Sequence, residues 1–206
     1  MTKAYLIADA DNIQVMGTDN KYTTYFLSNG KYGRGGNSYS ADLDGKWLKT
    51  AGAANDDKIT AGQAFWYVSR TASKENPQVL TVAGSVLTTS AVDPKTCVDT
   101  YTLMSNPYAC DVALNENIEV ENATKAYLIA DADNIQVMGA DGKYTTYFLS
   151  NGKYGRGGNS YNPDLDGKWL KTAGAACTDA IPAGASFWYV SRSNNSKVQL
   201  KNPLSK

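Results

Sequence analysis

The chain has 206 residues, of which 42% are hydrophobic and 19% charged, a composition typical of a folded protein. Basic and acidic side chains number 20 each, so no net field draws the chain toward nucleic acid or an anionic membrane. The complete absence of histidine excludes Ser-His-Asp and Cys-His catalytic arrangements and histidine-ligated zinc. We expect neither nucleic-acid binding nor membrane insertion.

Short strands and turns alternate along the chain, and no stretch keeps a 3.6-residue hydrophobic period. The first strands are expected at residues 4–8, 12–16, 22–28, 46–50 and 64–70. Turn dipeptides separate them at Asp19-Asn20, Asn29-Gly30, Asp44-Gly45 and Ala61-Gly62. Three further strands are expected at 79–83, 100–104 and 117–121. The first set then recurs, with a turn at Asp141-Gly142.

Several of these strands carry bulky residues on both faces. In the strand at 22–28, Tyr25 and Leu27 point to one side and Phe26 points to the other. A strand with two bulky faces belongs in the middle of a sheet that is covered on both sides. The sequence therefore predicts an all-β fold of tandem β-sandwich-like repeat modules with short antiparallel strands and little helix.

The chain contains two nearly identical copies of one sequence. Residues 3–70 align without a gap on residues 125–192, at an offset of 122, and 58 of the 68 aligned pairs are identical. Repeated equivalent surfaces are common in structural and multivalent proteins, whereas catalysis rarely needs two identical sites on one chain. We therefore expect no enzymatic activity.

The two copies differ in what surrounds them. The chain holds one complete repeat unit and one truncated unit, which we place at 79–206 and 1–78, with 79–124 as the segment that links the copies. Strands that lack a partner in the incomplete module favour pairing with a neighbouring chain.

Acidic turn-like sequences recur in both copies. Asp9, Asp11 and Asp19 recur as Asp131, Asp133 and Asp141. The Asp-Leu-Asp-Gly motif places alternate carboxylates beside a glycine, as oxygen-only Ca²⁺ loops require, but a third ligand and a closing glutamate are missing. A plain turn is therefore the preferred interpretation, with Ca²⁺ as the alternative and no other cofactor expected. The calcium candidates are Asp42, Asp44, Asp164 and Asp166.

A glycine- and tyrosine-rich segment, GKYGRGGNSY, occupies residues 30–39 and 152–161. It does not connect a strand to a helix as a phosphate-binding loop does. The preferred interpretation is a hairpin loop or a contact between modules, and the alternative is a loop that presents aromatic faces to sugar rings. A nearby tryptophan in each copy is core or part of that platform. The candidates are Tyr32, Arg34, Tyr39, Trp47, Tyr154, Arg156, Tyr161 and Trp169.

The chain has three cysteines, Cys97, Cys110 and Cys177. Cys177 stands where the first copy has Asn55, and the first copy also lacks the segment that holds the other two. A cysteine that disappears together with its potential partners suggests a disulfide, so we expect Cys177 to pair with Cys97 or Cys110. The third cysteine would be free or bridge to another chain. The alternative is three buried thiols in a reducing compartment.

Four motifs follow one another in the second unit: NPY at 106–108, DNIQV at 133–137, GKYTTY at 142–147 and IPAGASFW at 181–188. In this order they resemble tandem β-rich modules in large secreted or surface proteins of Planctomycetes and Verrucomicrobia-type bacteria. The resemblance covers roughly residues 79–200, and the first copy carries only the later part, with ITAG at 59–62 in place of IPAG. It implies an extracellular repeat module without a catalytic role.

Together these features predict an extracellular structural repeat protein, secreted or on the cell surface. Its copies are expected to assemble head to tail into a fibre, filament or layer. The alternative is a carbohydrate-binding or adhesive module that uses its paired aromatic loops on glycans. Met1 leads directly into a predicted strand, with no signal peptide, so we expect a mature form or a piece of a longer protein.

Overall fold

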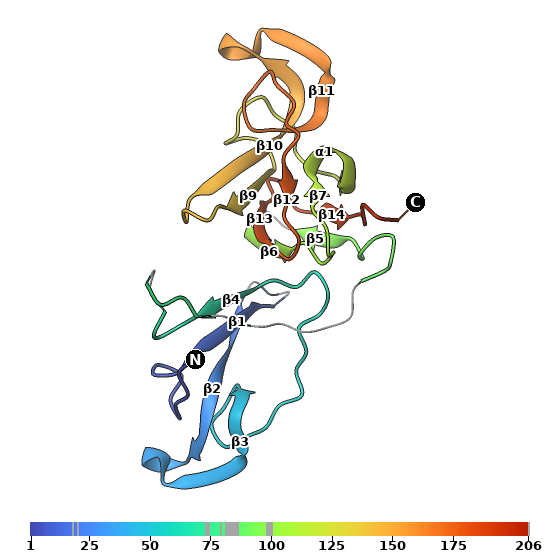
Figure 1. The fold of residues 1–206 in the computed structure, drawn as a ribbon. Helices are drawn as coiled ribbons and strands as arrows, with labels where there is room; N and C mark the ends of the chain where they lie inside the picture. Colours follow the sequence, from blue (N-terminus) through green and yellow to red (C-terminus); the bar gives the residue numbers. More distant parts are fainter. Residues whose placement is uncertain are drawn as a thin grey trace. The chain divides into compact units, whose positions relative to one another are not determined.

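The computed structural model describes residues 1–17, 19, 21–72, 75–78, 80, 87–97 and 101–205. The chain divides into two compact units, unit 1 (Met1–Gly84) and unit 2 (Ser85–Lys206), a few residues beyond the predicted boundary. Most of the regular structure is antiparallel strand (Figure 1), and the one α-helix found in the described ranges has four residues. The predicted all-β fold is confirmed.

Unit 1 contains one four-stranded antiparallel sheet, in the order β3-β2-β1-β4. Its strands are β1 (Asn12–Met16), β2 (Tyr22–Tyr32), β3 (Ser38–Leu48) and β4 (Phe65–Val68), with a short 3-10 turn, η1 (Arg34–Gly36), at the tip of the β2–β3 hairpin. The central strand β1 pairs with β2 on one side and with β4 on the other.

The pairing of β2 with β3 continues along the whole hairpin because bulges at two glycines accommodate extra residues. Asn29 pairs with Asp44 and Lys31 pairs with Tyr39, so Gly30 alone faces the residues between Tyr39 and Asp44. Gly30 has a φ of 77°, and a Cβ there would lie 2.7 Å from the Ser40 carbonyl oxygen. The turns predicted at Asn29-Gly30 and Asp44-Gly45 are wrong, because both glycines sit at bulges inside paired strands.

The other expected strands of the first copy have mixed outcomes. The strand at 12–16 is confirmed, while those at 22–28, 46–50 and 64–70 overlap β2, β3 and β4. The strand at 4–8 is wrong: Ala4 makes a single bridge to Ser28, and the chain then turns, with the Asp9 N–H donating to the Leu6 carbonyl at 3.2 Å. The strand at 79–83 lies outside the described residues, apart from residue 80.

Unit 2 repeats this sheet and adds a fifth strand to it. The order is β11-β10-β9-β13-β6, so β6 pairs with the edge that β13 presents. The strands are β6 (Tyr101–Ser105), β9 (Asn134–Met138), β10 (Tyr144–Tyr154), β11 (Ser160–Leu170) and β13 (Ser186–Val190), with η2 (Arg156–Gly158) at the hairpin tip. The strand predicted at 100–104 corresponds to β6.

A second layer covers one face of this sheet. It consists of β5 (Lys95–Cys97), β14 (Ser196–Leu200) and β8 (Ile118–Glu121), the pair β7 (Val112–Ala113) and β12 (Ala180–Ile181), and the short helix α1 (Leu114–Asn117). About half of the resulting core comes from outside the repeated sequence. Those buried residues are Cys97, Met104, Tyr108, Val112, Leu114, Ile118, Val198 and Leu200.

A buried aspartate ties each unit together. In unit 1, Asp11 is fully buried, and its carboxylate accepts hydrogen bonds from the Tyr67 hydroxyl at 2.7 Å, the Arg70 N–H at 2.7 Å and the Thr2 N–H at 3.0 Å. These bonds join the start of the chain and the end of β4 to the residue that precedes β1. The acidic turn expected here is present at residues 7–9, which include Asp9, whereas the side chain of Asp11 is buried.

The same aspartate recurs in unit 2. Asp133 accepts hydrogen bonds from the Tyr189 hydroxyl and the Arg192 N–H, both at 2.6 Å, and from the Ser196 hydroxyl at 2.7 Å. Because Ser196 opens β14, this carboxylate also fixes the strand of the second layer to the first.

The protonation states match these bonds. Burial and the hydrogen bond to Asp11 raise the pKa of Tyr67 to about 12, and burial with the bond to Asp133 likewise raises the pKa of Tyr189. Burial alone would raise the pKa of Asp11, but the bonds from Arg70, Tyr67 and Thr2 outweigh it and lower the value. In unit 1 a neutral phenol therefore donates to an ionised carboxylate at neutral pH.

We expect Asp133→Ala to lower the free energy of unfolding of unit 2 by about 2–4 kcal/mol, because three buried donors lose a charged acceptor. Denaturant unfolding followed by circular dichroism measures the loss. Asp131→Ala is the matched control, since Asp131 is exposed and lies two residues away; its effect should stay within about 0.5 kcal/mol. Equal losses in the two variants would contradict the role of Asp133.

Candidate functional site

One face of the unit 1 sheet lies open where the same face of unit 2 is covered. Both units bury a small cluster on the hairpin side, formed by Ala10, Phe26, Leu43 and Leu48 in unit 1 and by the equivalent residues in unit 2. The large second core of unit 2 has no counterpart among the described residues of unit 1. Unit 1 therefore has half of the sandwich that unit 2 completes.

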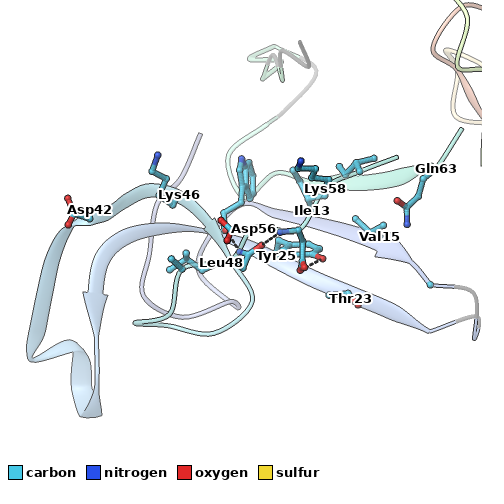
Figure 2. A pocket seen from close by; sticks show the side chains of 16 residues that line it. Ile13, Val15, Thr23, Tyr25, Asp42, Lys46, Leu48, Asp56, Lys58 and Gln63 are labelled. Carbon is cyan, nitrogen blue, oxygen red and sulfur yellow. Dashed lines mark hydrogen bonds between the residues drawn. The ribbon is translucent and has the colours of Figure 1, made fainter. Parts of the chain in front are cut away.

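The open face forms a groove of about 510 Å³. Its floor includes Ile13 and Val15 on β1 and Tyr25 on β2, while Lys46, Asp56 and Lys58 lie along its rim (Figure 2). Hydrophobic floor and charged rim together resemble the anatomy of a protein–protein interface more than that of an enclosed ligand cavity.

Three identical residues are buried in unit 2 and more accessible in unit 1, although Ile13 and Val15 of the groove floor are buried in unit 1 as well. Trp169, Ile181 and Phe187 are 2%, 0% and 1% exposed. Their counterparts are more open: Trp47 and Phe65 are half-buried, and Ile59 is 44% exposed. The missing cover, and not a change in these side chains, accounts for the difference.

The aromatic residues of the groove are nevertheless already in place. Trp47 and Tyr67 meet edge to face with ring centroids 6.5 Å apart, and Trp169 and Tyr189 do the same at 6.3 Å in the closed unit. The Asp11–Tyr67 hydrogen bond holds one of these rings. The open face therefore has the arrangement that unit 2 uses for packing.

The outer edge of β4 is the second part of the site. In unit 2, β13 pairs with β9 on one side and with β6 on the other, and the Ala185 carbonyl already accepts from the Asn106 N–H on the β6 side. Backbone groups of alternate residues point to the same side, so the peptide groups of Phe187 and Tyr189 also face β6. In β4 the equivalent residues are Phe65 and Tyr67, and no described strand pairs with that edge.

The ten differences between the copies concentrate at this groove. Six lie between residues 55 and 64. Asp56, Lys58 and Gln63 replace Thr178, Ala180 and Ala185 of unit 2, and all three line the groove. The rim of unit 1 is thus more polar than its closed counterpart, while the aromatic floor is unchanged.

A tyrosine–aspartate–lysine network lies beside the groove. The Tyr25 hydroxyl donates to Asp57 at 2.8 Å, and the Lys49 ammonium lies 2.5 Å from the same carboxylate. Burial and Asp57 raise the pKa of Tyr25, and the bonds from Lys49 and Tyr25 lower the pKa of Asp57. Both shifts move away from neutral pH, as expected for a phenol that donates to a carboxylate.

The cysteines do not form the predicted disulfide in the structure. All three are free thiols: Cys97 is buried, and Cys110 and Cys177 pack against the same core of unit 2. The Cys177 thiol donates to the Trp169 carbonyl at 3.2 Å.

The structure offers a different reason why Asn55 stands in unit 1 where unit 2 has Cys177. Asn115 of α1 donates to the Trp169 carbonyl at 3.0 Å and accepts from the Trp169 N–H at 2.7 Å. Unit 1 has no counterpart of α1 among its described residues, and there Asn55 supplies an amide to the Trp47 carbonyl at 2.6 Å. An asparagine therefore appears at residue 55 where the amide from the covering segment is missing.

The calcium candidates are engaged otherwise or exposed. Asp44 forms an ion pair with Lys3 at 3.1 Å, and Asp166 forms one with Lys125 at 3.0 Å. Asp42 and Asp164 lie exposed on β3 and β11. Across the described residues, no group of three His, Cys, Asp or Glu side chains is placed to hold a metal ion.

The predicted aromatic loop residues do not come together as one platform. Tyr39 and Tyr161 are 60% and 59% exposed, and Arg34 and Arg156 are exposed at the hairpin tips. The remaining candidates pack: Tyr32 and Tyr154 lie against Gly52 and Gly174, Trp47 faces the groove and Trp169 is core.

Sequence reasoning missed Ile59, which lines the groove, and Phe65 and Tyr67 of the neighbouring strand β4, as members of a site. The signal that could have found them is their identity with Ile181, Phe187 and Tyr189, since identical apolar residues with unequal flanking segments cannot all be covered in the same way.

No protein-family model, curated protein or solved structure matches the chain. The resemblance to secreted bacterial repeat modules therefore stays a prediction. No helix within the described ranges is long and apolar enough to cross a membrane.

We expect Trp47 to be quenched by acrylamide several-fold more efficiently than Trp169, because only Trp169 is sealed beneath a second layer. Variants that keep one of these tryptophans, with the other three changed to phenylalanine, allow Stern–Volmer constants to be compared. Equal constants in folded protein would contradict an open face on unit 1.

Proposed function

We propose that this protein is a non-catalytic structural repeat protein of the cell exterior, which associates with chains of its own kind through unit 1. The observation that carries the proposal is the open face: nearly the same sheet is sealed by a second layer in unit 2, and no such layer is found among the described residues of unit 1. The exterior location rests on the resemblance of the sequence motifs.

The energetics favour covering this face. Fully burying a large apolar side chain stabilises a structure by about 1.5–3 kcal/mol, and each backbone hydrogen bond adds about 0.5–1.5 kcal/mol. Trp47, Phe65 and Ile59 are all incompletely buried, and the β4 edge offers two outward-facing peptides. The sum is comparable to the cost of association, about 4–15 kcal/mol, so reversible assembly at moderate concentration is the expected behaviour.

The divergence between the copies also supports an interface. A face that needed no partner would be expected to lose its aromatic side chains, yet Trp47, Phe65 and Tyr67 are retained. Only the rim has become polar, through Asp56, Lys58 and Gln63. An apolar centre with a polar rim suits a surface that is exposed to solvent in the monomer and buried on association.

Sedimentation velocity over a range of protein concentrations tests the proposal. The unmodified chain should shift to larger species as concentration rises. Phe65→Lys should remain monomeric, because it places a charge on the groove face of the edge strand. Negative-stain electron microscopy then shows whether the species extend into filaments or layers.

Circular dichroism provides the folding control for Phe65→Lys, and its equivalent Phe187→Lys gives the contrast. Phe187 is 1% exposed, so the lysine there should unfold unit 2. An unmodified chain that is monomeric at every concentration would refute the proposed association.

A second candidate function is glycan binding, which the exposed Tyr39 and Tyr161 at identical hairpins favour. Two equal sites on one chain would bind a polymer by avidity. Affinity electrophoresis in polysaccharide gels should then show weak retardation for Tyr39→Ala or Tyr161→Ala and none for the double variant. Tyr101→Ala, which is also exposed but lies outside the hairpins, is the control. Equal retardation of all variants would exclude these tyrosines.

A further inference from the structure

The chain supplies one covering segment for two sheets of nearly identical sequence. In unit 2, β6 closes the β13 edge, and the residues through β8 cover the adjoining face. If the segment of one copy covered the unit 1 sheet of another copy, the unit 2 sheet of the first copy would lose its cover. Segment exchange therefore cannot close unit 1 across a population of chains. The surface of unit 1 that no described strand pairs with is the outer edge of β4, together with the adjoining groove face, and every copy carries it.

The β4 edge has a register in which it can pair with itself. Its outward peptide groups belong to Phe65 and Tyr67, two residues apart. A twofold axis at Trp66 places Phe65 opposite Tyr67 of the second copy, and the reverse, in hydrogen-bonded pairs that exchange both N–H···O bonds. In unit 2, Phe187 and Tyr189 face Met104 and Thr102 in the same manner.

This register also joins the two grooves. Residues directly opposite each other in an antiparallel pair point to the same face of the sheet, so Phe65 and Tyr67 of both copies share one face. Trp66 then lies opposite its own symmetry mate on the other face, as an aromatic cross-strand pair.

The charges around the groove fit a surface that meets its own copy. A patch of one sign would repel itself across a twofold axis, whereas this rim carries Lys46 and Lys58 together with Asp42 and Asp56. Both signs are available for pairing between the copies.

We propose that unit 1 forms a twofold-symmetric dimer with unit 1 of a second copy, with β4 paired antiparallel to β4 about an axis at Trp66. The inference rests on the proposed self-association and specifies its partner surface and symmetry. It makes this contact a closed one, in place of the head-to-tail contact expected from the sequence, so growth beyond a dimer needs a second surface.

Disulfide trapping tests the register. In a non-hydrogen-bonded antiparallel pair the two Cα atoms lie about 4.5 Å apart, within the range that a disulfide spans. Trp66→Cys should form covalent dimers under mild oxidation. Peptide mapping by mass spectrometry should show the introduced thiol of one copy linked to the introduced thiol of the other, distinct from links through native cysteines.

Trp188→Cys is the matched control. Both tryptophans donate their indole N–H to a tyrosine hydroxyl at 3.2 Å, Tyr22 for Trp66 and Tyr144 for Trp188, so both variants lose that bond. Trp188→Cys also loses the edge-to-face contact with Tyr101. In unit 2, β6 occupies the edge beside residue 188, so no covalent dimer through that residue is expected.

Residue-resolved amide hydrogen exchange tests the same pairing on the unmodified chain, without any substitution. The Phe65 and Tyr67 amides should become several-fold better protected as concentration rises through the dimerisation range. The Trp66 and Val68 amides, which face β1, should show a much smaller change.

The outcomes distinguish the twofold pairing of β4 from the self-association on which it rests. Association without a disulfide between the two introduced thiols, or without new protection at Phe65 and Tyr67, would overturn the twofold pairing and leave the proposed self-association standing. A chain that stays monomeric at all concentrations would overturn both.

Discussion

The hydrogen bonds to one buried carboxylate organise each sheet. Asp11 and Asp133 immediately precede the central strands β1 and β9, and each accepts from the hydroxyl of the tyrosine that is the penultimate residue of the strand alongside. An ionised group in the interior is stable only with several donors around it, so the carboxylate fixes the path of every segment that supplies one. In unit 1 it also holds Tyr67 against Trp47, so these two rings keep the edge-to-face arrangement seen in unit 2.

The same constraint limited what could be predicted from the sequence. The alternating patterns at β1, β6 and β8 were sufficient to place those strands, because their residues repeat with the pleat of a sheet. The residues at 4–8 have an equally apolar pattern, but the chain must turn there to bring Asp11 inside, and nothing local marks an aspartate as buried. The glycines at 30 and 45 suggested turns for a similar reason: their positive φ serves equally well in a bulge, and only the pairing of β2 with β3 decides which occurs.

The sequence indicated that an unpaired strand edge exists, but it did not indicate which strand carries it. Unequal completeness of the two copies indicated that some strand lacks a partner. Which strand that is depends on β6 pairing with β13, residues about 80 positions apart in sequence, and short patterns carry no information about such a pairing. The disulfide stays a prediction, and all three thiols are free in the structure. The Trp47 carbonyl accepts from Asn55 in unit 1, whereas the Trp169 carbonyl accepts both from Asn115 of α1 and from the Cys177 thiol in unit 2.

The pairing of β14 with β5 has a consequence for the order in which the chain acquires its structure. Ser196 lies opposite Cys97, so the second layer of unit 2 joins segments that emerge from the ribosome about 100 residues apart. All four strands of unit 1 lie between Asn12 and Val68 and can form while the rest is still being made. Contacts between distant segments form slowly. The sheet of unit 1 therefore needs no segment from beyond residue 68, whereas the second layer of unit 2 is complete only once β14 has been synthesised.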